Sequence, residues 1–446
     1  MIAGRLRNVI RNRRANVAIT FAFALIPLTL AVGAAVDYTS AARRESQMNA
    51  YADAAALAAV RPAELSQNDQ ASITAATNAF NAQAEAYSGV NYNPSNLQIT
   101  VVDAPTSRTV TVVWSATSPN TFAGILGFAT SPLGGTSQAV GSLAPNINFY
   151  LLLDSSPSQA IAATQDGIDT MVANTSAQGG CAFGCHESDP QYDNLGNPGG
   201  EDNYTLARNL GVTLRIDNVT AAAQALMSTA QTTEETDKAT YGMAIYTFDE
   251  AVSTIQTLTT NLSQAEQSAG NITLLEVYHQ NCLTSIVCND DEDTNYDLAM
   301  NTINTTMPNP GNGTNDPGDT PQEVLFLVTD GVEDEYQSSP QYPTTLDPGR
   351  QQYLMNSNTD WCTTVKNRGI RIAILYTEYL PLPTNAWYEN FDNSGNGISS
   401  FQSDIGQQLQ NCASPGLYYE VETGGDITTA LNSLFQIVVQ TSHLSQ

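Results

Sequence analysis

The chain has 446 residues, enough for more than one domain, and its hydrophobic fraction of 41% is ordinary for a folded protein. Its formal net charge is −28, yet seven of the 16 basic residues lie before residue 45, where Asp37 is the one acid. The rest of the chain therefore carries 43 acids and 9 bases. Because such a surface repels phosphate backbones, the composition excludes nucleic-acid binding.

An uncharged apolar run, Val17 to Val36, follows the first arginines. It is long enough to cross a bilayer as a helix. Five arginines precede the run and Asp37 follows it, so the positive-inside rule predicts that residues 1–16 stay cytoplasmic and that the rest is exported. A cleaved signal peptide is the alternative. The length of the run, and the alanine-rich helical stretch that continues from Ser40 to Val60, favour a permanent span.

The residues after this span predict a small α+β module. Ser40 to Ala63 is alanine-rich and predicts a helix. Two alternating, β-branched segments, Leu97–Val102 and Arg108–Trp114, predict a hairpin, and Thr136–Leu143 predicts a third strand. Thr121–Phe128 is a short apolar segment before that strand. No residue in this region suggests chemistry, so a stalk that spaces the next domain from the membrane is the alternative.

From residue 146 onward, buried strands alternate with helical stretches, which is typical of an α/β domain. Phe149 to Leu153 is an unbroken apolar run before Asp154 and predicts a strand buried on both faces of a parallel sheet. Further strands are predicted at Tyr241–Phe248, Val324–Thr329, Ile370–Tyr376 and Leu417–Val421. Helices are predicted at Gln159–Ala173, Asp217–Ala230, Asn295–Asn304, Asp360–Asn367, Ser399–Gln410 and Asp426–Val439. Residues 179–204 and 308–320 have the composition of loop insertions.

Oxygen-bearing side chains stand where a parallel sheet places its ligands, at the carboxyl ends of strands. Asp154, Ser156 and Ser158 follow the first strand and offer a carboxylate and two hydroxyls. Asp330 follows a second buried strand, and Thr294 stands at the entrance of a predicted helix. Carboxylate and hydroxyl oxygens are hard donors that suit Mg²⁺, Mn²⁺ or Ca²⁺. The sequence therefore predicts a divalent metal site built from these five residues.

The donor set favours binding over catalysis. Three hydroxyls and two carboxylates supply five ligands and leave one coordination position of a divalent ion open, and the natural sixth ligand is an acidic side chain from a partner protein. Nothing nearby supplies a general base or a nucleophile, so we do not expect an enzyme. The alternative makes the serines and the threonine ordinary helix caps on a domain that has lost its metal.

Two parts of the chain resemble known families. Asp-x-Ser-x-Ser, a loop threonine and Thr-Asp-Gly after a strand come in the order of the metal-ion-dependent adhesion site, so the chain from Asn148 onward resembles a von Willebrand factor A (vWA) domain. Arg14–Pro27 followed by Ala35–Tyr38 is similar to the start of TadE/TadG-type proteins of the Flp (tight adherence) pilus system, and Ala430–Gln446 is similar to their closing helix and tail. The glycine and glutamate at the peptidase cut of TadE-type pseudopilins are missing before the apolar run, which favours a permanent anchor.

The resemblance implies a TadG-like architecture. Its parts are a cytoplasmic basic segment (1–16), a transmembrane helix (17–36), a pilin-like α+β module (37–145) and a vWA domain with a Rossmann-like, doubly wound, mostly parallel sheet (146–446). It implies a Flp pilus assembly or adhesion factor in the inner membrane, with its vWA domain in the periplasm or at the cell surface. That domain would bind a pilus or surface protein through the metal. The alternative is a minor pilin-like tip adhesin exported with the pilus.

Six cysteines in an exported region predict disulfides. Sequence alone does not choose among the pairings, but proximity favours Cys181–Cys185 and Cys282–Cys288, which leaves Cys362 with Cys412. Cys181-Ala-Phe-Gly-Cys185-His186 also invites a haem or zinc interpretation. The haem motif has two residues between its cysteines and this segment has three, so a disulfide-pinned loop is the preferred prediction.

Overall fold

The computed structural model describes residues 13–442 except 66, 105–106, 143, 194, 280–281, 284–292, 315–317, 335–359, 383–384, 390–396 and 423–425. It divides into two compact units, Met1–Leu143 and Ala144–Gln446. Each unit has its own hydrophobic core.

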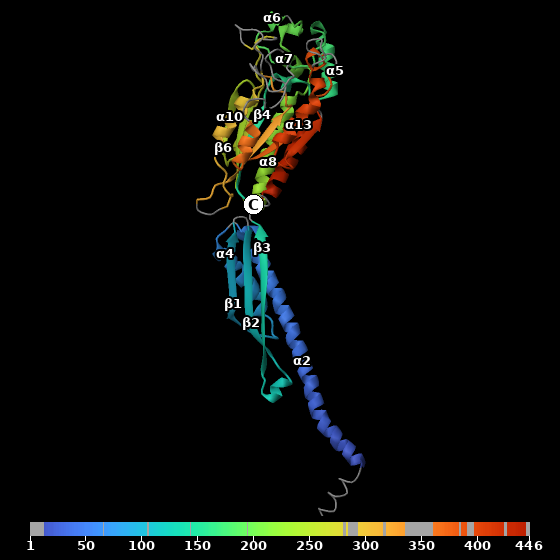
Figure 1. The fold of residues 1–446 in the computed structure, drawn as a ribbon, viewed down its shortest axis with the longest axis vertical. Helices are drawn as coiled ribbons and strands as arrows, with labels where there is room; N and C mark the ends of the chain where they lie inside the picture. Colours follow the sequence, from blue (N-terminus) through green and yellow to red (C-terminus); the bar gives the residue numbers. More distant parts are fainter. Residues whose placement is uncertain are drawn as a thin grey trace, which may run out of the picture. The chain divides into compact units, whose positions relative to one another are not determined.

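The first unit packs helices against one antiparallel sheet (Figure 1). Its core gathers alanines and Met48 of the long helix, Phe80 of a second helix and the inward side chains of the central strand, among them Trp114. That strand alternates buried and more exposed positions, as expected for a sheet covered on one face. The predicted hairpin and third strand are confirmed, whereas a further helix, Asp69–Ala84, was not predicted. The elements are α2 Arg13–Ala59, α3 Pro62–Leu65, α4 Asp69–Ala84, β1 Asn91–Ala104, β2 Ser107–Pro119, the 3-10 helix η1 Ala123–Leu126 and β3 Thr130–Ser142.

The second unit is built on a six-stranded sheet with the order β6-β5-β4-β7-β8-β9. Every neighbouring pair is parallel except β5–β6, so the predicted doubly wound, mostly parallel sheet is confirmed. β4, β5 and β7 are buried at every position, which explains why their central residues are apolar without alternation. The strands are β4 Ile147–Asp154, β5 Tyr241–Phe248, β6 Val252–Thr259, β7 Gln322–Thr329, β8 Arg371–Glu378 and β9 Tyr418–Glu422.

Helices lie on both faces of this sheet (Figure 1). α8 packs against α9 and α14, while α10 packs against α11, which a disulfide joins to α13. The principal helices are α5 Gln165–Asn174, α7 Asn203–Asn209, α8 Arg215–Asp237, α9 Leu262–Ala269, α10 Tyr296–Thr306, α11 Trp361–Asn367, α13 Gln402–Cys412 and α14 Ile427–Thr441. Short helices α6 Pro190–Asp193 and α12 Ala386–Glu389, and 3-10 turns η2 Pro157–Ala160, η3 Ser176–Gln178, η4 Pro198–Gly200 and η5 Ile398–Ser400, complete the unit.

One predicted helix was wrong in its first half. The stretch after Ser158 forms a 3-10 turn and then extended backbone, and α5 begins only at Gln165. Ile161 and Ala162 are extended because they form β-bridges with Phe183 and Leu214. These bridges tie the chain after β4 to the segments around residues 183 and 214.

Candidate metal-binding site

The sheet brings two of the predicted acids to one edge. Asp154 is the last residue of β4, and Asp330 directly follows Thr329, the last residue of the adjacent parallel strand β7. Both side chains are buried, with exposed fractions of 1% and 0%. Two neighbouring carboxylates that are buried away from solvent are stable only with a compensating charge or a set of hydrogen-bond donors.

Hydrogen bonds connect four of the five predicted ligands. Asp154 Oδ1 accepts from the Ser156 hydroxyl at 2.6 Å, and the Ser156 and Ser158 hydroxyl oxygens are 2.9 Å apart. The Ser158 hydroxyl in turn donates to Asp330 Oδ2 at 2.5 Å. The oxygens of Asp154, Ser156, Ser158 and Asp330 therefore form a continuous chain from one buried carboxylate to the other.

Thr294 reaches this edge through its backbone. It forms a β-bridge with Asp334, four residues after Asp330, with hydrogen bonds in both directions at 3.2 and 3.0 Å. Within the described part of the chain, its side chain makes no hydrogen bond to the other four predicted ligands. Thr294 is thus placed beside the Asp330 loop, and its role as a ligand stays a prediction.

The structure adds a cation that the sequence did not predict. Arg215, the first residue of α8, is 2% exposed and its Nη1 lies 3.4 Å from Asp330 Oδ2. Its Nη2 donates to the carbonyl oxygen of Thr377 at 2.6 Å and to the Thr377 hydroxyl at 2.9 Å, and its guanidinium lies over the ring of Tyr379. The helix dipole disfavours a cation at the first turn of a helix. The buried Asp330 carboxylate attracts Arg215 and explains its position.

Other hydrogen bonds orient the two carboxylates. The Thr329 hydroxyl donates to Asp154 Oδ2 at 2.7 Å, and Gln159 Nε2 donates to Asp330 Oδ2 at 3.1 Å. The hydroxyls of Thr329 and Tyr296 are also hydrogen-bonded, which connects the site to α10. Thr329 and Gln159 were missed because nothing in the sequence distinguishes them from strand and loop residues.

The electrostatics of the site favour a cation. Burial raises the pKa of the Asp154 carboxyl to about 7, and the nearby Asp330 carboxylate acts in the same direction. Hydrogen bonds from Ser156 and Thr329 oppose this rise. A positive ion between the two carboxylates would stabilise their charged forms and lower that pKa.

The residues present fit a hard divalent cation. They supply two carboxylates and two hydroxyls with oxygens already within hydrogen-bond distance of one another. Gln159 Oε1 is a further buried oxygen that has no hydrogen-bond partner. Oxygen donors of this kind bind Mg²⁺, Mn²⁺ or Ca²⁺ and do not select soft metals.

The cysteines agree with the prediction in part. Cys362 and Cys412 form a disulfide, as predicted, and tie α11 to α13. Cys282 is disulfide-bonded, but its predicted partner Cys288 lies outside the described residues.

The predicted Cys181–Cys185 disulfide is wrong, because both thiols are free. The backbone between them is used elsewhere: Phe183 bridges Ile161, and the amide of Gly184 donates to Ala160. Burial raises the pKa of both thiols, so they are protonated at neutral pH. Nearby, the His186 ring stacks on Tyr204 and its Nε2 lies 3.8 Å from an Asp202 oxygen.

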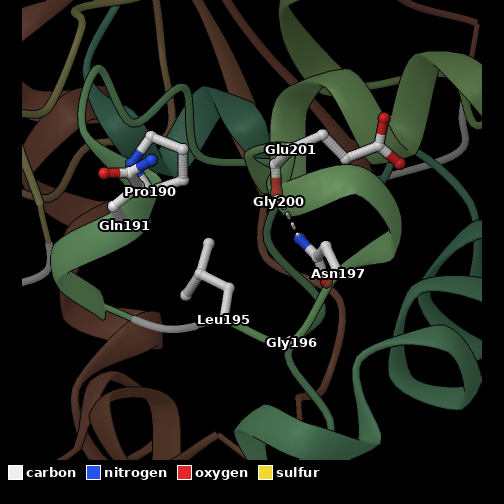
Figure 2. Close-up of a pocket in the computed structure, with 7 residues that line it drawn as sticks. All are labelled: Pro190, Gln191, Leu195, Gly196, Asn197, Gly200 and Glu201. Carbon is white, nitrogen blue, oxygen red and sulfur yellow. Dashed lines mark hydrogen bonds between the residues drawn. The ribbon is translucent and has the colours of Figure 1, made fainter.

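A separate pocket lies in the insertion at 179–204. It has a volume of roughly 260 Å³ and is lined by backbone, small residues and a few polar side chains (Figure 2). Its acid, Glu201, accepts from Asn209 Nδ2 at 2.7 Å, and Asn197 donates to the Glu201 carbonyl. The lining offers no nucleophile paired with a base, so we assign no chemistry to this pocket. The lining residues are Pro190, Gln191, Leu195, Gly196, Asn197, Gly200 and Glu201.

In a comparison with known proteins, the amino-terminal segment matches a family model. Residues 15–62 match the model described as putative Flp pilus-assembly TadE/G-like. Within the described residues, the helical stretch Val17–Ala59 is long and apolar enough to contain a membrane span. A sequence search of curated proteins finds no match.

Several solved structures are similar to the chain. BatB from Bacteroides thetaiotaomicron aligns with 66% of this chain and 100% of its own at 12% identity and a TM-score of 0.33. The vWF domain of the type V pili tip protein Mfa5 from Porphyromonas gingivalis aligns with 68% of this chain and 96% of its own at 9% identity and a TM-score of 0.34. The pilus adhesin SpaC from Lactobacillus rhamnosus GG aligns with 78% of this chain and 35% of its own at 10% identity and a TM-score of 0.36.

At these identities and TM-scores, the similar structures carry no argument about function. The fold rests on the chain's own strand order, with five parallel strands and an antiparallel edge strand. The chain therefore has a TadE/G-like segment at residues 15–62, followed by an α/β unit with a mostly parallel sheet.

Proposed function

We propose that this protein is a membrane-anchored Flp pilus assembly or adhesion factor whose vWA domain binds a protein partner through a divalent cation. The observation that carries the proposal is the chain of four oxygens between the buried carboxylates of Asp154 and Asp330. The TadE/G-like segment at 15–62 supports the connection to the pilus system.

Charge balance supports an acidic partner. The two carboxylates and Arg215 together carry one net negative charge, so a bound divalent cation leaves one net positive charge at the site. A single carboxylate from a partner neutralises that charge and fills an open coordination position of the metal. Ser158 keeps the largest exposed fraction of the four oxygen-bearing residues, at 8%, and we propose that the partner approaches from its side. The proposed role is binding, without catalysis.

The membrane anchor belongs to the same proposal. Five arginines precede the apolar run, which supports a cytoplasmic amino terminus and a vWA domain in the periplasm or at the cell surface. Fractionation tests this placement: the chain stays with the inner membrane when pili are sheared from the cells. Recovery of the chain in the sheared pili would instead assign it to the fibre as a tip adhesin.

The partner-binding role is tested in cells of the host bacterium that carry Asp154→Ala. The matched control is Ser155→Ala, because Ser155 is equally buried but donates to Phe248 and Asp249 instead of the four-oxygen chain. We expect pilus assembly or surface adhesion to be lost with Asp154→Ala and kept with Ser155→Ala, at equal amounts of protein in the membrane. Normal assembly and adhesion with Asp154→Ala would contradict the proposal.

A further inference from the structure

The loop between β2 and β3 exposes an unusual group of large apolar side chains. Phe122, Ile125, Leu126 and Phe128 have exposed fractions of 42%, 77%, 57% and 67%. The segment from residue 109 to residue 153 contains no charged residue, so the loop has no charged side chain of its own to favour contact with water. A contiguous exposed apolar group of this kind marks a surface that contacts a partner or a membrane.

Hydrogen bonds hold this loop against α2. The two carboxylate oxygens of Asp37 accept from the backbone amides of Thr121, Phe122 and Ala123 at 2.9, 2.9 and 2.7 Å. Gly33 lies so close to Phe122 that a Cβ atom there would come within 2.6 Å of the Phe122 Cβ. The loop is thus fixed beside the stretch of α2 from Gly33 to Asp37.

A second clamp lies further along α2. Arg44 Nη1 donates to the Ser118 hydroxyl at 2.6 Å and to the Pro119 carbonyl at 3.0 Å. As it leaves β2, the chain therefore runs along α2 from Arg44 to Gly33, toward the amino-terminal part of that helix. Figure 1 shows the loop at that end of the sheet, beside α2.

The position of Gly33 sets the depth of the loop relative to a bilayer. Gly33 lies inside the uncharged run Val17–Val36, roughly 24 Å along the helix from Val17 at about 1.5 Å per residue. The hydrocarbon core of a bilayer is about 30 Å thick. A loop fixed at Gly33 therefore lies at the boundary of the hydrocarbon, on the side where α2 leaves it.

We propose that Phe122, Ile125, Leu126 and Phe128 insert into the same bilayer that α2 crosses. The loop would act as a second membrane contact, and Asp37 and Gly33 would hold it at the depth of the interface. Continuity with the apolar surface of α2 favours lipid as the occupant, since Phe21 and Phe23 of that helix are also exposed, at 66% and 73%. Two contacts would fix the orientation of the first unit on the membrane surface, which a single helix cannot do.

The test measures membrane depth in the full chain, reconstituted in phosphatidylethanolamine–phosphatidylglycerol vesicles. An environment-sensitive fluorophore is attached to one cysteine, in a background with Cys181→Ser and Cys185→Ser. Leu126→Cys reports on the loop. Val140→Cys is the matched control, because Val140 is 61% exposed on β3 and pairs with Thr109 at the opposite end of the sheet.

Phe23→Cys reports independently on the span itself, so failure of the span and failure of the loop are distinguished. We expect lipid-borne nitroxide to quench the probe at 23 and at 126, and aqueous iodide to quench the probe at 126 several-fold less than the probe at 140. Equal iodide quenching at 126 and 140, with the probe at 23 still protected, would overturn the proposal. If the probe at 126 is protected from iodide only in vesicles that hold several copies of the chain, the loop contacts another copy. That result would also overturn the proposal.

Discussion

Removing the guanidinium of Arg215 gives the sharpest test of the site's electrostatics. Arg215→Met keeps most of the aliphatic volume and leaves the carboxylates of Asp154 and Asp330 buried without their protein cation. Removing one partner of a buried ion pair costs about 3–5 kcal/mol. In the presence of a chelator, we therefore expect the second unit to lose stability by about that amount.

The same substitution is expected to tighten metal binding. Arg215 Nη1 lies 3.4 Å from Asp330 Oδ2, so an ion bound by that oxygen would sit within roughly 6 Å of the guanidinium. At that distance and an effective dielectric constant of about 20, the repulsion between the two cations is on the order of 5 kcal/mol. Even a third of this repulsion exceeds the ~1.4 kcal/mol that changes an affinity tenfold, so we expect at least tenfold tighter binding.

Two assays check these effects in the detergent-solubilised chain. Hydrogen exchange of β4 and β7 peptides measures the stability of the second unit, and the paramagnetic resonance signal of free Mn²⁺ measures metal affinity. Arg208→Met is the control, because Arg208 pairs with Asp217 at the surface and such pairs contribute about 0–1 kcal/mol. Unchanged Mn²⁺ affinity and unchanged exchange in Arg215→Met would refute the reasoning.

Three further predictions concern stability and the cysteines. Burial raises the pKa of Glu323 to about 7 from an ordinary 4.5, so its contribution to the stability of the second unit falls as pH rises from about 4.5 to 7. Glu323→Gln should remove this share of the slope in pH-dependent hydrogen exchange, leave the share of Asp154, and gain up to about 3 kcal/mol at pH 8. An unchanged slope would contradict this prediction. The Cys362–Cys412 disulfide closes a sequence separation of 50 residues, so replacing both cysteines by serine should lower the free energy of unfolding by about 4 kcal/mol in hydrogen exchange. A decrease below about 1 kcal/mol would contradict the loop-closure argument. Alkylation of the denatured, unreduced chain followed by mass spectrometry should modify Cys181 and Cys185, and their recovery as one cross-linked peptide would contradict the free thiols.

The central sheet could be predicted because its strands are buried on both faces. β4, β5 and β7 have central runs of apolar residues without alternation, which are typical of strands buried on both faces. β6 was missed because it is an edge strand, half exposed and rich in threonine and serine. α4 was missed because its alanines and asparagines lack a strong apolar period.

The candidate site could be predicted only where its residues follow a strand. Asp154 ends β4, Ser156 and Ser158 follow it, and Asp330 follows β7, so strand prediction alone brings the four residues together. Arg215 comes from the start of α8, and its place beside Asp330 depends on the bridge between Ala162 and Leu214. A sequence pattern contains no trace of such a bridge. The one available signal was an arginine between two apolar residues, Leu214 and Ile216, in a region with few bases.

Proximity in sequence misled the prediction for Cys181 and Cys185. A short spacing makes a disulfide easy to form only if the residues between are free to turn. Here Phe183 is held by its bridge to Ile161, and the Cys181 sulfur accepts from the Phe183 amide at 3.4 Å. The longer-range pair, Cys362 with Cys412, was reached by elimination, and the fold brings the two Cα atoms to 5.1 Å of each other.

Calorimetric titration of Mg²⁺, Mn²⁺ and Ca²⁺ into the purified full chain tests the metal site most directly. Ser156→Ala and Ser155→Ala are a matched pair, since both serines are buried but only the Ser156 hydroxyl belongs to the four-oxygen chain. We expect one ion to bind the unaltered chain and Ser155→Ala, and binding to be lost in Asp154→Ala and weakened in Ser156→Ala. Binding that persists unchanged in Asp154→Ala, or an unaltered chain that binds none of the three ions, would contradict the account.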